Sequence, residues 1–207
     1  MIASPLESTL EPHESNTGTK PSMVITAEEG DSGSTSNVQN LNLIFTVSED
    51  TESFEFSDIS VSGGTLSSFA GSGSRYTATL VGNADIAKVQ VENNKFTDFA
   101  GNANSAVEFI YNIDTVHPTV TIEATEGISG FSSNDDSLNL QFTVSEDTVD
   151  FEQSDITASG GVLSSFQGSG RVYIAVFTPN SNSVETSIQI NHNMFHDTVG
   201  NGNEVIS

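Results

Sequence analysis

The stretch Leu41–Phe69 reads LNLIFTVSEDTESFEFSDISVSGGTLSSF, and a second copy, LNLQFTVSEDTVDFEQSDITASGGVLSSF, lies 97 residues further on at Leu138–Phe166. The two copies are identical at 22 of 29 positions. A repeat of this length is too long for a solenoid unit and fits the size of one small domain. The sequence therefore predicts two copies of one domain in tandem.

The apolar residues inside each copy alternate with polar ones, as in a strand with one buried face. Leu41, Phe45 and Val47 share one face, and the second copy keeps this pattern. Gly-rich turns separate the apolar segments at intervals typical of short strands. In the first copy we expect strands at 21–25, 41–47, 58–61, 65–69, 75–80, 89–91 and 106–111. The fold class is therefore all-β, with two tandem immunoglobulin-like seven-strand antiparallel β-sandwiches.

These signals also divide the chain into segments. Residues 1–20, rich in Ser, Thr, Glu and Pro, are expected to form a disordered lead-in. Domain 1 then covers 21–114 and domain 2 covers 115–207. The second copy has a truncated last strand, shorter by about six residues than the first. Two interpretations are open: the chain is a piece of a longer array, or a neighbouring chain donates the strand.

The charge balance limits the possible partners. The 207 residues include 28 Asp and Glu against 5 Lys and Arg, a formal net charge of −23. Nucleic acids and anionic membranes bind basic surfaces, so neither is expected as a partner. No apolar run approaches the ~20 residues that a membrane span needs. The N-terminus has no signal-peptide pattern, so we expect any export signal to lie outside this chain.

Acidic loops are expected to meet at one pole of each sandwich, because three of its loops and the incoming linker lie at the same end. Carboxylates and amides are oxygen ligands that suit Ca²⁺ better than Mg²⁺, and the chain has no Cys for zinc. We predict a Ca²⁺ site at the junction of the two domains. Its expected ligands are Asp114, Glu146, Asp147, Asp197 and, less firmly supported, Asn201. The alternative is a solvated acidic loop beside an Asn- and Gly-containing turn.

The first copy repeats most of this pattern and predicts a weaker second site. Its expected ligands are Glu49, Asp50, Asp98 and Asn102. The segment before the first domain, Thr17-Gly-Thr-Lys20, has no carboxylate at the position equivalent to Asp114. Weaker binding is therefore expected at this pole.

No pattern in the sequence predicts catalysis. His192 and His196 have a spacing that binds zinc on a helix, but here the segment follows a strand. Paired carboxylates also occur in glycoside hydrolases, yet the chain has no Trp to form a sugar platform. We expect no enzyme activity, no catalytic residues and no cofactor other than Ca²⁺.

The ordered motifs F-T-V-S-E-D, S-D-I-x-x-S-G-G-x-L-S-S-F, Y-x-A, F-x-D-x-x-G-N-x-N and D-T-x-x-P resemble those of bacterial Ig-like repeats. Such repeats occur in large surface adhesins and biofilm-associated proteins, and the resemblance covers about 185 residues. It implies a sandwich used as an extender that Ca²⁺ stiffens between domains. The positions it links to the ion are Asp114, Glu146, Asp147 and Asp197. The segment Thr17-Gly-Thr-Lys20 departs from the family's D-T-x-x-P.

The expected function is a structural spacer of an extracellular or cell-surface adhesin, with its junction stiffened by Ca²⁺. Its expected partners are neighbouring Ig-like repeats in a longer chain. One alternative is a module that binds a cell-surface glycan or protein, for which Phe54, Phe56 and Phe99 are candidate aromatic contacts. Another is a pair of accessory domains in a secreted enzyme.

Overall fold

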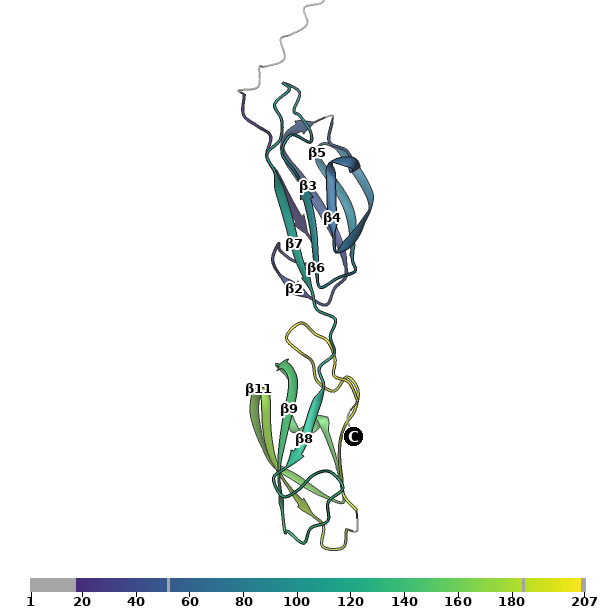
Figure 1. Cartoon of the computed structure of the whole chain (residues 1–207), viewed down its shortest axis with the longest axis vertical. Coiled ribbons are helices and arrows are strands. Elements are labelled where there is room, and N and C mark those ends of the chain that lie inside the picture. The colour runs from purple at the N-terminus through teal and green to yellow at the C-terminus, as the bar shows by residue number, and fades with distance from the viewer. Residues whose placement is uncertain (1–17, 52, 184, 206–207) are drawn as a thin grey trace, which may run out of the picture. The chain divides into compact units, whose positions relative to one another are not determined.

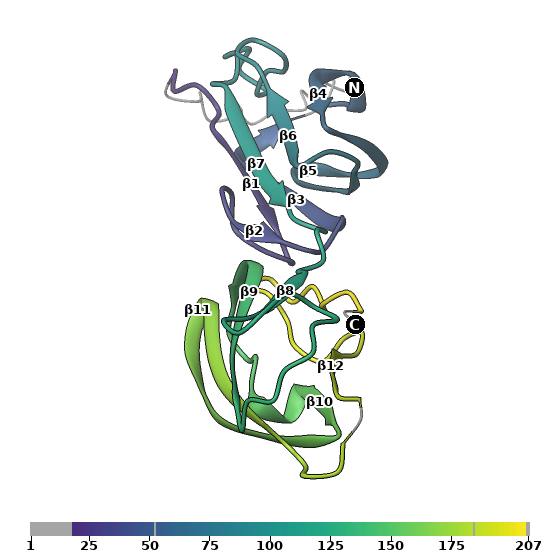
Figure 2. The ribbon, with the colours of Figure 1, turned by 60° about the horizontal axis from the view of Figure 1, so that its bottom comes forward.

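The computed structural model describes residues 18–51, 53–183 and 185–205 (Figure 1). Most of the expected lead-in, residues 1–20, lies outside these. The described chain consists of strands, loops and two short 3-10 turns, without any α-helix in these ranges. It forms two compact units (Figure 2). Unit 1 is built from 18–34 and 38–113, and unit 2 from 114–205 together with the short segment 35–37.

Unit 1 contains two antiparallel sheets. The first has the order β1-β3-β5, and the second has the order β7-β6-β4, with the two-residue β2 of segment 35–37 paired to β7. Ile25 pairs with Phe45, and Phe45 pairs with Tyr76, so apolar side chains face the same side across the first sheet. The strands are β1 (Met23–Ala27), β2 (Thr35–Ser36), β3 (Asn40–Thr51), β4 (Ile59–Ser62), β5 (Gly64–Gly82), β6 (Ile86–Val91) and β7 (Val107–Ile113).

The core of unit 1 lies between these sheets and confirms the alternation read from the sequence. Leu43 of β3, Val89 of β6 and Phe109 of β7 are fully buried in one apolar cluster. Phe54 adds an aromatic centre, with its ring 5.0 Å from the rings of Tyr76 and Phe96. Packed aromatic rings at such distances contribute both buried area and a specific geometry.

Unit 2 repeats this arrangement with fewer strands. Its first sheet has the order β11-β9-β8 and its second contains β10 and β12. In the described residues of this unit no strand follows β12, so β7 has no counterpart there. The strands are β8 (Val120–Ala124), β9 (Leu138–Thr148), β10 (Ile156–Ser159), β11 (Gly161–Pro179) and β12 (Ser187–Ile190).

The region from 63 to 82 differs from the expected two separate strands joined by Gly-rich turns. The predicted strands 65–69 and 75–80 belong to a single element, β5, which folds back on itself. A Cβ at Gly64 would lie 2.8 Å from the Val81 carbonyl oxygen, and one at Gly71 would clash with the Arg75 carbonyl oxygen. Gly63, with φ at +66°, connects β4 to β5 in the other sheet and does not form a hairpin turn.

The repeated Ser-Asp-Ile motif also has a structural role. Phe56–Asp58 forms a 3-10 turn that precedes β4, and the Glu55 N–H donates to Asp58 Oδ2 at 2.9 Å. In unit 2, Gln153–Asp155 forms the same turn, and the Glu152 N–H donates to Asp155 Oδ2 at 2.8 Å. These aspartates therefore cap the 3-10 turns that directly precede β4 and β10. Neither aspartate belongs to the predicted metal site.

Candidate metal centre

Three segments of unit 2 bring carboxylates to one place. Asp114 is the first residue after β7 ends at Ile113. Glu146 lies near the end of β9, which continues to Thr148. Asp197 follows β12 and is held against the end of β9 by a bridge to Thr148. The loop order that the sequence suggested therefore places these three side chains together.

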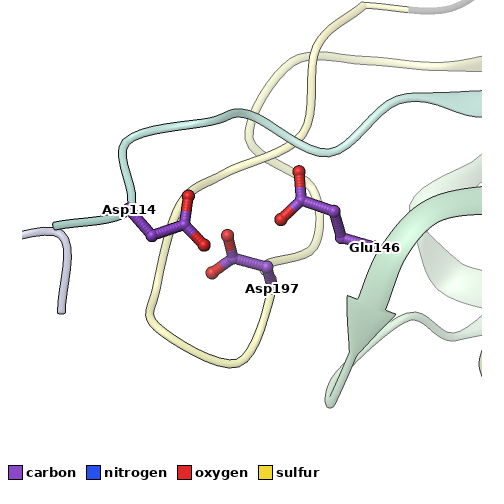
Figure 3. Close-up of side chains that lie close together, drawn as sticks. All are labelled: Asp114, Glu146 and Asp197. Atoms are coloured by element: carbon purple, nitrogen blue, oxygen red, sulfur yellow. The ribbon is translucent and has the colours of Figure 1, made fainter. Parts of the chain in front are cut away.

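The three side chains form a compact acidic group. One carboxylate oxygen from each of Asp114, Glu146 and Asp197 lies within 4.8 Å of the others. In Figure 3 the three carboxylates point toward one another from separate segments. Asp197 is 3 % exposed, and the other two are half-buried. Such a group is stabilised when a cation bridges it, because like charges at this separation repel one another.

Asp197 is held in its ionised form by the turn that follows it. Burial of its carboxyl raises its pKa, but hydrogen bonds outweigh this effect and the pKa lies below its ordinary value. The N–H groups of Val199 and Asn201 donate to Oδ1 at 2.9 Å, and the Asn201 amide donates to Oδ2 at 2.8 Å. A carboxylate fixed in this way is a preformed anionic ligand.

Glu146 has the opposite shift. Burial raises the pKa of its carboxyl, and the charges of Asp114 and Asp197 raise it further, while Arg171 lowers it. The guanidinium of Arg171 forms its ion pair with Asp147, at 3.3 Å from Nε to Oδ1. A divalent cation at Glu146 would remove the repulsion that raises its pKa, so the chemistry of this group suits a cation that prefers oxygen ligands.

Two other predicted ligands, Asp147 and Asn201, lie outside the three-carboxylate group. Asp147 is exposed and pairs with Arg171, outside the three-carboxylate group. The amide of Asn201 donates to the backbone carbonyl of Asp114 at 3.0 Å as well as to Asp197. Asn201 is therefore adjacent to the group and ties the first residue of unit 2 to the turn of Asp197.

Unit 1 has the same turn after β6, but its described residues do not form a three-carboxylate group. Asp98 bridges to Thr51, and Asn102 donates to Asp98 through its backbone N–H and its side-chain amide, both at 2.9 Å. These bonds hold the Asp98 pKa below its ordinary value, although burial opposes them. Among the described residues, no group of three metal-binding side chains includes Glu49, Asp50 or Asp98.

His192 and His196, the two histidines considered for zinc, contact different residues. His196 Nδ1 lies 2.8 Å from Asp150 Oδ2, and the His196 N–H donates to Asp150 Oδ1. The ring of His192 packs edge-on against His117, with centroids 6.3 Å apart, and His117 Nδ1 lies 2.7 Å from the Gly202 carbonyl oxygen. His192 and His196 thus have different partners, and no described group of three metal-binding side chains includes either.

The three aromatic residues predicted to contact a ligand differ in their exposure to solvent. Phe54 is buried in the core, as is its counterpart Phe151. Phe56 and Phe99 are 51 % and 59 % exposed. Of the three predicted aromatic contacts, therefore, only Phe56 and Phe99 present a large apolar surface to solvent.

Asn104 and Asn203 are structural residues that the sequence did not separate from ligands. Asn203, two residues after Asn201, is fully buried. Its Oδ1 accepts from the Met194 and Phe195 N–H groups, while its amide donates to the carbonyls of Asn191 and Glu204. Asn104 makes equivalent bonds in unit 1. The repeated Asn-x-Asn pattern marks these positions in the sequence. The pattern alone does not show that the second Asn stabilises the turn through its hydrogen bonds.

The chain belongs to a family of bacterial Ig-like domains, whose model matches residues 17–113 and again 114–207. This confirms the resemblance read from the repeated motifs and the tandem immunoglobulin-like fold. A comparison with curated proteins gave no match. Within the described part of the chain, no helix has the length and apolar character needed to cross a membrane.

Proposed function

We propose that this chain is a spacer segment of an extracellular, adhesin-like surface protein and that unit 2 binds Ca²⁺ through Asp114, Glu146 and Asp197. The observation that carries the proposal is the convergence of these carboxylates within 4.8 Å, in a chain of net charge −23. Tandem Ig-like domains support a mechanical role, since each copy adds length without needing a separate binding surface. The remaining coordination positions of such an ion are filled by backbone oxygens and water.

The position of Asp114 gives the ion its proposed mechanical effect. Asp114 directly follows Ile113, the last residue of β7, so it belongs to the segment that connects the two units. The Asn201 amide already holds the Asp114 carbonyl, and an ion shared with Glu146 and Asp197 would in addition fix its side chain against β9 and the turn after β12. The connection would then lose conformational freedom, and the chain would stiffen when Ca²⁺ binds.

Calcium titration combined with solution scattering tests this proposal. Calorimetry should show Ca²⁺ binding in the range of about 10⁻⁴–10⁻³ M that is common for extracellular modules. Scattering should give a narrower distribution of maximum dimensions in Ca²⁺ than in EDTA. Asp114→Asn should weaken both effects. The matched control is Asp50→Asn in unit 1, which should leave the tighter binding event unchanged.

Two outcomes would count against the proposal. If calorimetry detects no binding, the acidic group is a solvated loop. If Ca²⁺ binds but scattering curves are the same in Ca²⁺ and EDTA, the ion stabilises unit 2 without stiffening the connection. The second outcome would overturn the mechanical role and leave the metal site intact.

A second candidate function is recognition of a glycan or protein, and the exposure of Phe56 and Phe99 favours it. Exposed aromatic rings pack against sugar rings and apolar side chains in binding sites. A glycan array probed with the intact chain tests this function. Binding that is lost in Phe56→Ser or Phe99→Ser would support a recognition module, whereas a pure spacer should give no signal.

A further inference from the structure

A groove of about 470 Å³ lies on the outer face of the first sheet of unit 1, away from the core. It follows β5 from Arg75 to Thr79, four residues that span about 13 Å of strand. This length suits a short, extended ligand. The polar side chains that line the groove are Glu28, Asn42, Ser68, Arg75, Thr77 and Thr79.

Arg75 has no carboxylate partner among the described residues. The chain contains 5 Lys and Arg against 28 Asp and Glu, so carboxylates are abundant. Lys88 forms an ion pair with Glu108, and Arg171 forms one with Asp147, but no described carboxylate pairs with the exposed guanidinium of Arg75. An unpaired guanidinium can hold a ligand carboxylate through two parallel N–H donors.

The arginine of unit 2 has a different position. The register of the sheets places Val172 where unit 1 has Arg75. Arg171 lies one residue earlier and pairs with Asp147 at the acidic pole. A shift of one residue along a strand moves a side chain to the other face of the sheet. The arginine is therefore used at the pole in unit 2 and in the groove in unit 1.

The equivalent groove of unit 2 has lost the charges and most of the hydroxyls. Its volume is about 170 Å³, and Ile174 and Val176 stand where unit 1 has Thr77 and Thr79. Neither charged side chain of the unit 1 groove has a charged counterpart in it. The second copy thus provides a control groove of the same fold within the same chain.

A kinked edge residue lines the groove in both units. Ser68 has φ at +54° and its counterpart Ser165 has φ at +56°, in the left-handed region that residues other than glycine rarely adopt. Such a conformation persists only where the surrounding fold enforces it. The hollow is therefore a property of the fold, whereas its charged and hydroxyl lining is a property of the unit 1 sequence.

The groove offers side-chain hydrogen bonds without free backbone groups. Along its floor, β3 pairs with β1 on one side and with β5 on the other, so a peptide cannot add main-chain bonds there. Recognition depends on the Arg75 guanidinium and the Glu28 carboxylate. The hydroxyls of Ser68, Thr77 and Thr79 complete the set. These groups complement a ligand that carries several hydroxyls and a carboxylate.

From the unpaired guanidinium and the polar lining beside it, we propose that this groove binds a short acidic saccharide. A uronic acid carboxylate pairs with Arg75, and sugar hydroxyls bond to the other polar side chains of the groove. One carboxylate is the limit, because the groove has one cation and the net charge of −23 repels further anionic groups. The site is separate from the proposed calcium ligands and from Phe56 and Phe99.

An NMR titration of the ¹⁵N-labelled 207-residue protein in EDTA tests the groove. The probe is cellobiouronic acid, a disaccharide with a single carboxylate. We expect saturable shifts of the amides of 42–46 and 75–79, with a dissociation constant in the millimolar range. The amides of 139–143 and 172–176 should not shift, since they belong to the control groove. Cellobiose, which lacks only the carboxylate, should bind at least about tenfold more weakly.

Arg75→Gln should weaken the binding of cellobiouronic acid at least about tenfold as well. The side chain is exposed, so unchanged resonances elsewhere in unit 1 will show that the fold is kept. The matched variant is Arg171→Gln, which removes the other exposed arginine of β11 and should leave the affinity unchanged.

Four results would overturn the proposal. The first is the absence of shifts at tens of millimolar ligand, and the second is equal binding of cellobiose. The third is equal shifts in both grooves, which would show that Arg75 is not read. The fourth is equally tight binding of a capped Thr-Glu dipeptide, because an acidic peptide would then be the occupant. Since EDTA is present throughout, none of these results bears on the calcium site.

Discussion

The acidic poles of the two units have the same loops but not the same arrangement of charge. Each contains an Asp in the turn after β6 or β12, Asp98 or Asp197, and both fix it with hydrogen bonds from an Asn four residues later. Among the described residues, only unit 2 adds a carboxylate from the segment that enters it, Asp114. The corresponding position in the first copy is Thr17.

This comparison shows that the domain alone does not make the three-carboxylate group. Each domain contributes an acidic strand end and an acidic turn, and the preceding segment determines whether a third carboxylate is present. The proposed calcium site is therefore a property of the connection as much as of the fold. The variants below change one pole and use the other as the reference.

Removal of the turn carboxylate should have the largest effect. Asp197→Ala loses the hydrogen bonds to Val199 and Asn201 and one proposed calcium ligand. We expect about 2–4 kcal/mol of lost stability in chelator and a greater loss in calcium, measured by denaturant unfolding. Asp98→Ala should destabilise unit 1 equally in both conditions. Equal effects of calcium on the two variants would remove the distinction between the poles.

Asp114→Asn removes a charge while keeping the shape of the side chain. The wild-type chain should gain about 2.7 kcal/mol from calcium at a hundredfold excess over Kd. Tenfold weaker binding in the variant would remove about 1.4 kcal/mol of this gain. Thermal melts at several calcium concentrations measure the difference. A variant as responsive as the wild type would show that Asp114 is not a ligand.

The reverse change should give unit 1 a carboxylate equivalent to that of Asp114. Thr17→Asp places a carboxylate at the sequence position that corresponds to Asp114. We expect a second calcium-binding event of comparable strength, seen as an increase in stoichiometry by calorimetry, with at most about 1–2 kcal/mol of added stability. An unchanged stoichiometry would mean that other differences between the poles matter more.

Glu146 should make calcium-free unit 2 sensitive to pH. Because its pKa is raised in the folded state, the fold favours its protonated form. Its contribution is therefore most favourable below the ordinary Glu pKa of about 4.3 and is lost as pH rises through the raised value. In metal-free buffer, Tm should fall by a few degrees at most over this window. Glu146→Gln should abolish this fall, whereas Glu49→Gln, the equivalent change in unit 1, should leave it in place.

The smallest expected effect concerns Tyr111, whose hydroxyl is buried without a hydrogen-bond partner among the described residues. Tyr111→Phe removes this group and should raise the stability of unit 1 by up to about 1 kcal/mol. Unfolding monitored in denaturant measures it. A clear loss of stability would show that the hydroxyl has a favourable interaction in solution, and Tyr76→Phe provides the contrast, because Tyr76 donates to the Thr51 carbonyl.

Much of the fold could be predicted because burial follows a period of two along the strands. Leu41, Leu43 and Phe45 marked β3, and the same pattern in the second copy marked β9. The path of the chain around Gly63 was less predictable. A positive φ serves a hairpin turn and a crossing between sheets equally well, so the glycine alone does not decide between them.

The placement of the acidic side chains was predicted in part for a related reason. The sequence placed Glu146 and Asp147 together in a loop, but β9 continues to Thr148. Successive side chains on a strand point to opposite sides, so Glu146 faces Asp197 while Asp147 reaches Arg171. Asp114 and Asp197 were predicted correctly as neighbours of Glu146, because the order of strands fixes which loops share a pole.

The hydrogen bond from the Asn201 amide to the Asp114 carbonyl has a kinetic consequence. It positions the entering segment through neutral groups, so the carboxylates are already close together without the proposed calcium ion. A preorganised site needs little rearrangement on association, and its on-rate is then governed mainly by diffusion and by the attraction of an anionic surface. A chain with such a site would follow changes in the calcium level of its surroundings without delay.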